Sequence, residues 1–325
     1  MPNALFVGLC TLDVIQLVDH VPAPNEKLTA LAQTIAAGGP ATNAAATFSH
    51  LGGTATLLTA IGTHPLAAGI TADLAALGVT VLDQTPTDAN PPTVSTIHIT
   101  AATGERAVAS TNAAHHHLTP PDNLAALVAA ADYLELDGHH PDLALPAADT
   151  ARRLARPTLL DAGSWKPATE ALLPSIDIAL CSADFHPPGT VSPKDTLAFL
   201  HDHAVPWAAI SDGSAPILWS GPNCGGSIDV PALPIADTLA AGDILHGALT
   251  YHLAQAGPPD AHTFPAALTQ AAAVASLSCA SFGTRAWMRA DATSGPTAPA
   301  QPRSDDGEQE HGQPHDQPSN KRLGE

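Results

Sequence analysis

The stretch Asp237-Thr238-Leu239-Ala240-Ala241-Gly242-Asp243-Ile244-Leu245-His246-Gly247-Ala248 places a turn of small residues and an acid directly before an apolar segment. Residues 244–255 carry an apolar face and few helix breakers, so we expect a helix there. The backbone N–H groups of Ala240, Ala241 and Gly242 would then lie free at its first turn, and such a helix start attracts anions. The stretch therefore predicts a phosphate-binding turn.

Asp243 is an unusual neighbour for such a turn, because a carboxylate repels a bound phosphate. Its expected role is chemical: it accepts a proton from a hydroxyl that attacks the phosphate. The alternative is a carboxylate that only stabilises the helix N-terminus. If position 240 requires a positive φ, alanine there costs roughly 1 kcal/mol, yet no N–H donor is lost.

The same stretch resembles the second signature of the ribokinase-like (PfkB) family of carbohydrate kinases, Asp-Thr-x-Gly-Ala-Gly-Asp, with Ala240 in place of a glycine. The resemblance implies a ribokinase-like three-layer α/β/α domain with a mostly parallel sheet and a small β-sheet lid. It assigns the anion hole to Ala240, Ala241 and Gly242 and the catalytic base to Asp243. It also implies ATP and Mg²⁺ as cofactors and leaves room for a monovalent cation such as K⁺.

A second motif, Gly38-Gly39-Pro40-Ala41-Thr42-Asn43, resembles the first signature of that family and lies about two hundred residues earlier. The resemblance implies that Gly39 lets the backbone close on a sugar, while Asn43 and Asp13 bind its hydroxyls. A carboxylate suits this task because it can accept from two adjacent hydroxyls. The alternatives are a helix start without substrate and a solvated strand acid. Lys27 could face an anionic group on the substrate or only solvent.

Two excursions from the strand and helix alternation, residues 11–37 and 93–112, contain extended segments and are predicted to form the lid. Exposed lid strands would allow a homodimer. From residue 120 onward strands and helices alternate, which predicts a parallel sheet covered on both faces.

Further candidates follow predicted strands or glycine turns on the nucleotide side, by analogy with the family. They are Lys166, Ser182, Ser211, Gly213 and Gly283. The family's magnesium-associated Asn-x-x-Glu would fall at residues 182–185, where neither usual residue stands. Asp184 is the candidate metal ligand there.

Composition limits the class of protein. The chain has 325 residues, 45% of them hydrophobic, which allows one large α/β domain or two smaller ones, and the family resemblance implies one kinase domain over residues 1–290. The formal charge of −19 argues against a nucleic-acid or a membrane partner. Four widely spaced cysteines and the lack of an apolar leader indicate reduced cytoplasm. Residues 291–325, rich in Pro, Gly, Gln and acids, are predicted to be a disordered tail.

No P-loop motif and no dinucleotide-binding glycine motif occurs, which argues against those nucleotide-binding classes. The resemblance to the family implies an ATP-dependent phosphotransferase acting on a hydroxyl of a small sugar, similar to ribokinase, fructokinase or ketohexokinase. A nucleoside kinase of the same fold and a catalytically silent sugar-binding protein are the alternatives. The sequence does not identify the sugar.

Overall fold

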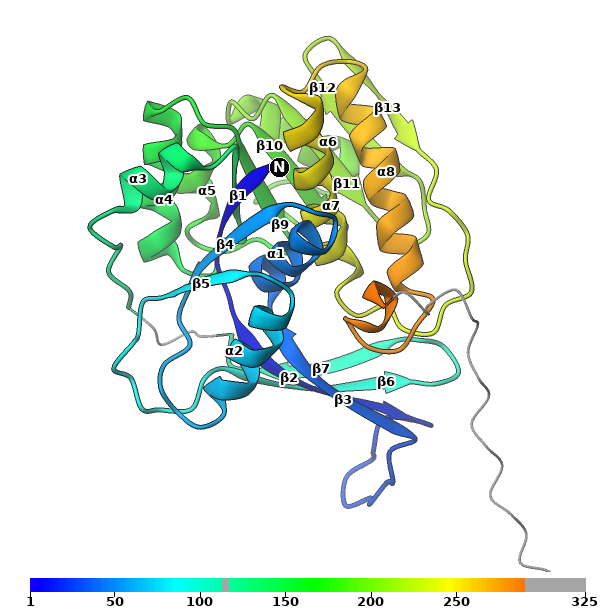
Figure 1. Ribbon diagram of the computed structural model, residues 1–325. Coiled ribbons are helices and arrows are strands. Elements are labelled where there is room, and N and C mark those ends of the chain that lie inside the picture. Colours follow the sequence, from blue (N-terminus) through cyan, green and yellow to red (C-terminus); the bar gives the residue numbers. More distant parts are fainter. Residues whose placement is uncertain (113–116, 290–325) are drawn as a thin grey trace, which may run out of the picture. The chain divides into compact units, whose positions relative to one another are not determined.

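A computed structural model of the chain describes residues 1–112 and 117–289. The predicted tail, residues 291–325, lies outside the described residues. Figure 1 shows a large central sheet with helices on both of its faces and a smaller sheet beside it. None of the helices in the described ranges is both long and apolar enough to cross a bilayer.

The central sheet contains nine strands within the described residues, in the order β13-β12-β11-β10-β9-β8-β1-β4-β5. Its seven parallel strands run from β5 to β11, and the hairpin β12–β13 is antiparallel. The bounds are β1 (Asn3–Val7), β4 (Thr54–Thr59), β5 (Thr80–Asp83), β8 (Tyr133–Leu136), β9 (Thr158–Ala162), β10 (Ile178–Ser182), β11 (Trp207–Ser211), β12 (Ile217–Gly221) and β13 (Cys224–Ile228).

Both faces of the sheet are buried under helices. Because successive side chains of a strand point to opposite faces, each strand contributes residues to two separate cores. Phe6 of β1 lies in one core cluster, with residues of four helices, and its neighbour Val7 lies in the other. The first face is covered by α1 (Pro40–His50), α2 (Ala67–Ala76), α7 (Ala241–Ala256) and α8 (Thr263–Ser278). The second face is covered by α3 (Leu124–Ala130), α4 (Pro141–Arg153), α5 (Thr169–Leu172) and α6 (Pro193–Asp202).

The smaller sheet has the strand order β3-β2-β6-β7 and is built from the two excursions predicted from the sequence. Its strands are β2 (Thr11–Val18), β3 (Ala32–Gly38), β6 (Val94–Thr100) and β7 (Arg106–Ser110). Ile15, Ile97 and Ile99 form its own small core, against which Leu239 and Phe282 pack. The predicted α/β architecture with a mostly parallel sheet and a small extra sheet is thus confirmed.

The observed elements differ from the predictions in detail. The helix expected at residues 244–255 begins one turn earlier, at Ala241, so that Gly242 and Asp243 lie within its first turn. The hairpin β12–β13 was not predicted, because Gly225 and Gly226 interrupt the residue pattern of β13.

Candidate active site

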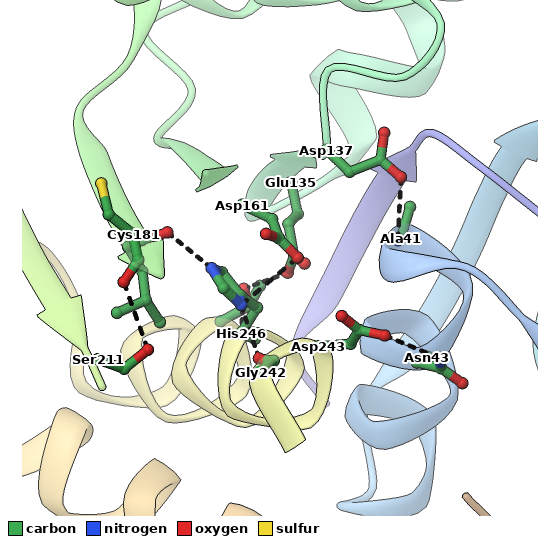
Figure 2. A network of polar contacts seen from close by, with 12 residues as sticks. Ala41, Asn43, Glu135, Asp137, Asp161, Cys181, Ser211, Gly242, Asp243 and His246 are labelled. Atoms are coloured by element: carbon green, nitrogen blue, oxygen red, sulfur yellow. Dashed lines mark hydrogen bonds and ion pairs between the residues drawn. The ribbon is translucent and has the colours of Figure 1, made fainter. Parts of the chain in front are cut away.

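The candidate site lies where the parallel strands of the large sheet end and the helices α1 and α7 begin (Figure 2). Carboxyl ends of parallel strands lie at one edge of a sheet, which is where ligands bind in open α/β folds. Asp137 follows β8 and Asp161 lies near the end of β9. This edge therefore gathers several acids next to two helix N-termini.

The start of α7 provides backbone donors. Ala240 precedes the helix with φ 59°, in the left-handed region. The N–H group of Ala241 faces Thr238 O at a long 3.4 Å. Among the described residues no acceptor is found for the N–H groups of Ala240, Gly242 and Asp243. These N–H groups can therefore donate to an anion.

Asn43 and Asp243 meet although they lie 200 residues apart in the sequence. Asn43 Nδ2 donates to Asp243 Oδ2 at 2.8 Å. This contact requires a close approach of α1 and α7, and Gly247 permits it: a Cβ at position 247 would lie 2.3 Å from Ala44 O. The two predicted signatures thus lie in direct contact.

Arg285 fixes the orientation of Asn43 and was missed by the sequence reasoning. Its Nη1 donates to Asn43 Oδ1 at 3.0 Å, its Nη2 donates to Ala37 O at 2.8 Å, and its Nε lies 3.3 Å from Asp73 Oδ2. Because the amide oxygen accepts from Arg285, the amide nitrogen is directed toward Asp243. The arginine side chain is only 13% exposed.

Asp13 and Gly39 lie on the same side of the site as Asn43. Thr11 Oγ1 donates to Asp13 Oδ1. A Cβ on Gly38 would overlap the Asp13 carboxylate, at 1.9 Å from Oδ2, so glycine is needed there. Gly39 has φ 98°, and a Cβ on it would lie 2.4 Å from Leu9 O. Burial raises the pKa of Asp13, opposed by hydroxyl donors and by the charge of Arg285.

The electrostatic surroundings of Asp243 favour its protonated form. Burial raises the pKa of this carboxyl to about 7, and Asp161 adds to the effect, whereas the hydrogen bond from Asn43 opposes it. Glu135 lies in the same cluster, and burial raises its pKa to about 8. Acids within otherwise apolar strands, such as Glu135 between Leu134 and Leu136, are a sequence signal that could have identified this cluster.

The candidates for the nucleotide side are more scattered. Ser211 ends β11 and its hydroxyl donates to Cys181 O at 3.3 Å, while Ser182 ends β10 and accepts from the N–H of Asp184. Gly213, with φ 53°, lies in the turn after β11. The aliphatic chain of Lys166 lies near Gly138, with its Nζ 3.4 Å from Ser164 O.

Gly283 and Lys27 lie in different settings. Gly283, with φ 86°, donates its N–H to Asp237 Oδ2 at 2.9 Å and lies against Thr34 of the small sheet. Asp237 also accepts from Leu239 N, so this acid ties the turn before α7 to the segment after α8. Lys27 is exposed between β2 and β3, with no polar contact to the described site residues.

Within the described ranges, no group of three or more His, Cys, Asp or Glu side chains could hold a metal ion. Asp184 is exposed and belongs to no such group of ligands among the described residues. Because Mg²⁺ is usually held by one or two carboxylates together with substrate phosphates, these residues fit an ion that arrives on a nucleotide rather than a resident metal.

Comparisons with known proteins give a family match and several structures of similar fold. A family model described as "pfkB family carbohydrate kinase" matches residues 1–291. A protein of Agrobacterium tumefaciens provisionally assigned as a ribokinase has 26% identity and a TM-score of 0.75, with 87% of this chain and 92% of the other covered. The search of curated protein sequences gives no match.

Two further solved structures share the fold at lower identity. One is the ribokinase of Arabidopsis thaliana complexed with ribose and ATP, with 20% identity, a TM-score of 0.68 and coverage of 87% and 93%. The other is the adenosine kinase of Sinorhizobium meliloti, with 19% identity, a TM-score of 0.74 and coverage of 87% and 95%.

Proposed function

Because the chain belongs to the pfkB family of carbohydrate kinases, we propose that it transfers the γ-phosphoryl group of ATP to a hydroxyl of a small sugar. The observation that carries the proposal is the 2.8 Å contact between Asn43 and Asp243 at the open start of α7. In this contact an amide and an acid lie beside N–H groups that can donate to a phosphate. These are the groups that phosphoryl transfer to an alcohol requires.

On the acceptor side, Asp13, Gly39 and Asn43 position the sugar, and Arg285 holds the Asn43 amide in place. Asp243 takes the proton of the hydroxyl as its oxygen attacks the γ-phosphorus. A pKa of about 7, set by burial and by Asp161, suits a general base near neutral pH.

On the phosphate side, the N–H groups at Ala240 and Gly242 donate to the transferring phosphoryl group, with Ala241 in the same turn. The candidates for holding the nucleotide are Lys166, Ser182, Ser211, Gly213 and Gly283. ATP use is supported by the nucleotide in one solved relative. Mg²⁺ carried by the phosphates, with Asp184 as the candidate protein ligand, supplies charge neutralisation when bound.

The small sheet serves as the lid of the proposed kinase domain. It packs its isoleucine core against Leu239, directly before the phosphate-binding turn, so its movement would open or close the site. Closure excludes water, which otherwise competes with the sugar as acceptor. Its outer strands β3 and β7 carry the exposed Ile35 and Val108, which supports pairing of two copies through the lid.

The test is ADP release from ATP and Mg²⁺ with a panel of pentoses, ketohexoses and nucleosides. Release that depends on a sugar supports the proposal. Release only with nucleosides would favour a nucleoside kinase, and the structural likeness to an adenosine kinase is the reason for including nucleosides in the panel. Sugar binding without ADP release would indicate a catalytically silent sugar-binding protein and overturn the proposal.

A further inference from the structure

His246 lies on α7, close to Asp243, and its ring is inserted between this helix and β10 (Figure 2). Its Nδ1 lies 2.7 Å from Gly242 O, and its Nε2 lies 2.9 Å from Leu180 O. Both partners are backbone carbonyl oxygens, which can only accept. A neutral imidazole has a single N–H group, so only the doubly protonated ring can donate to both.

From this geometry we propose that His246 is a buried imidazolium, and that it is a positioning residue which balances the acids around Asp243. The protonation state is independent of the reaction. The consequence for Asp243 rests on the proposed kinase function.

The acids around the ring provide a second and independent argument. Asp161 Oδ2 lies 3.5 Å from His246 Nδ1, and the His246 side chain is only 4% exposed. Within the described ranges, Asp161 Oδ2 has no hydrogen-bond partner. Buried carboxylate oxygens without donors are costly unless a cation faces them, and the imidazolium is that cation.

The pKa of His246 reflects the same balance. Burial is the largest influence and lowers it, but Asp161, the Glu135 carboxyl when ionised, and the two carbonyl groups together raise it above its ordinary value. The other groups nearby are the Cys181 thiol, whose pKa burial raises, and Asp243.

Glu135 is best explained as a neutral acid. Thr250 has one hydroxyl proton, yet its Oγ1 lies 2.6 Å from Glu135 Oε2 and 3.0 Å from the backbone oxygen of His246. A protonated Glu135 that donates to Thr250 frees the threonine proton for the backbone oxygen. The raised pKa of Glu135, about 8 and caused mainly by burial, agrees with this arrangement. The Asp161 carboxylate and the His246 imidazolium then remain as an ion pair.

This pair has two effects on the proposed site. The imidazolium offsets the negative charge of Asp161, which would otherwise make ionisation of Asp243 less favourable. Arg106 of β7 acts in the same direction. The imidazolium also ties the carbonyl of Gly242, in the first turn of α7, to Leu180 in the middle of β10. The imidazolium thereby supports both the charge of the base and the position of the donor turn.

The protonation state can be measured directly on the intact protein by NMR, with isotope-labelled histidine ring nitrogens. We expect one of the 17 histidines to keep protons on both ring nitrogens well above pH 7, with slow exchange, and to disappear from the spectrum of His246→Gln. A His246 ring with one bare nitrogen near neutral pH would overturn the proposal, whether or not the protein is a kinase.

The effect on Asp243 is tested by the acid limb of kcat/KM against pH in two variants with opposite expectations. His246→Gln removes the cation, so the limb should move about one unit to higher pH. Asp161→Asn removes a negative charge, so the limb should move to lower pH. A purely structural role would lower the rate without opposite displacements. His252→Gln, at a half-buried position six residues later on the same helix, is the matched control and should leave the limb in place.

If His246→Gln does not fold, the pH profile of Asp161→Asn still tests the charge-balancing role, and the NMR spectrum of the wild type still tests the protonation state. A limb that does not move in the folded Asp161→Asn variant would refute the charge-balancing role. Absence of kinase activity on every acceptor would refute the proposed function but would leave the NMR result to decide the protonation state.

Discussion

The two helices that meet at the candidate site begin in similar ways and yet do different things. Each follows a residue with positive φ, Gly39 before α1 and Ala240 before α7. The helices lie side by side, with Gly247 against the backbone of Ala44. By backbone geometry alone, either N-terminus could receive an anion.

The difference lies in what already fills each helix start. At α1, Asp137 Oδ2 accepts from the N–H groups of Ala41 and Leu9, so an internal carboxylate occupies the position of an anion. At α7, the N–H groups of Gly242 and Asp243 have no acceptor among the described residues. Because Asp137 already accepts at the start of α1, this helix contributes the Asn43 side chain and not an anion site. The N–H groups at the start of α7 are free to donate to a phosphate.

The largest expected effect concerns the acid of the open helix start. Asp243→Asn keeps a side chain of the same size but removes the proton acceptor, so we expect kcat to fall by roughly a thousandfold. Single-turnover assays with the best acceptor from the panel would measure this. Sugar affinity, followed by calorimetry, should change by less than about threefold, because Asn43, Asp13 and Arg285 are intact. Wild-type turnover in this variant would exclude Asp243 as the base.

A pair of glycine substitutions separates the two helix starts next. Gly39→Ala places a Cβ 2.4 Å from Leu9 O at a φ of 98°, and we expect the free energy of unfolding to fall by about 3 kcal/mol or more. Gly242→Ala meets no atom within 4 Å, so the fold should be unaffected or slightly stabilised.

The added methyl at position 242 nevertheless lies where a phosphate would approach. The KM for ATP should rise roughly tenfold in Gly242→Ala while urea unfolding stays close to wild type. An unchanged KM would argue that the nucleotide does not contact this turn.

The occupied start of α1 gives a stability prediction of intermediate size. Burial, the largest influence, raises the pKa of Asp137, but the charge of His139 and N–H donors bring it below its ordinary value on balance. Asp137→Asn should lower the free energy of unfolding by about 2 kcal/mol at neutral pH. A group with a lowered pKa stabilises above its unfolded-state value, so the difference should shrink as pH falls below about 4.

Urea unfolding of both proteins across this pH range checks the prediction. Asp132→Asn is the control, because Asp132 also accepts from a backbone N–H group, that of Asn3, but is exposed. It should change stability by less than about 1 kcal/mol. An equal loss in the two variants would mean that the helix start draws no special stability from Asp137.

Much of the fold could be predicted because its elements have local signals. Apolar strands alternating with helices predicted the parallel sheet, and the segments outside that alternation predicted the small sheet. The β12–β13 hairpin escaped, because Gly226 of β13 supplies space for the Trp219 indole rather than an apolar side chain. A strand whose glycines make room for a neighbouring side chain lacks the apolar and polar alternation from which a strand is predicted.

The candidate site likewise contains residues that the sequence identifies and residues that it does not. Asn43 and Asp243 belong to short motifs whose glycines and small residues are visible in the sequence. Arg285 does not: its contact with Asn43 spans 242 residues and depends on how the segment after α8 packs. The role of His246 depends on the positions of two carbonyl groups, one of them in another element, which no local pattern encodes.

The smallest expected effect concerns the alanine that precedes the open helix start. Ala240 has φ 59°, so Ala240→Gly relieves roughly 1 kcal/mol of backbone strain but loses a buried methyl group packed with Ile244 and Trp287. We expect a gain of no more than about 0.5 kcal/mol in the free energy of unfolding.

Ala155→Gly and Ala204→Gly are matched controls, since both alanines have positive φ after α4 and α6 and are exposed. They should gain more than Ala240→Gly, because no packing is lost. Alanine and glycine at position 240 both keep the backbone N–H donors of the turn, so kcat of Ala240→Gly should stay within about twofold of wild type. A tenfold rise in kcat would mean that Ala240 holds the donors of α7 away from the phosphate.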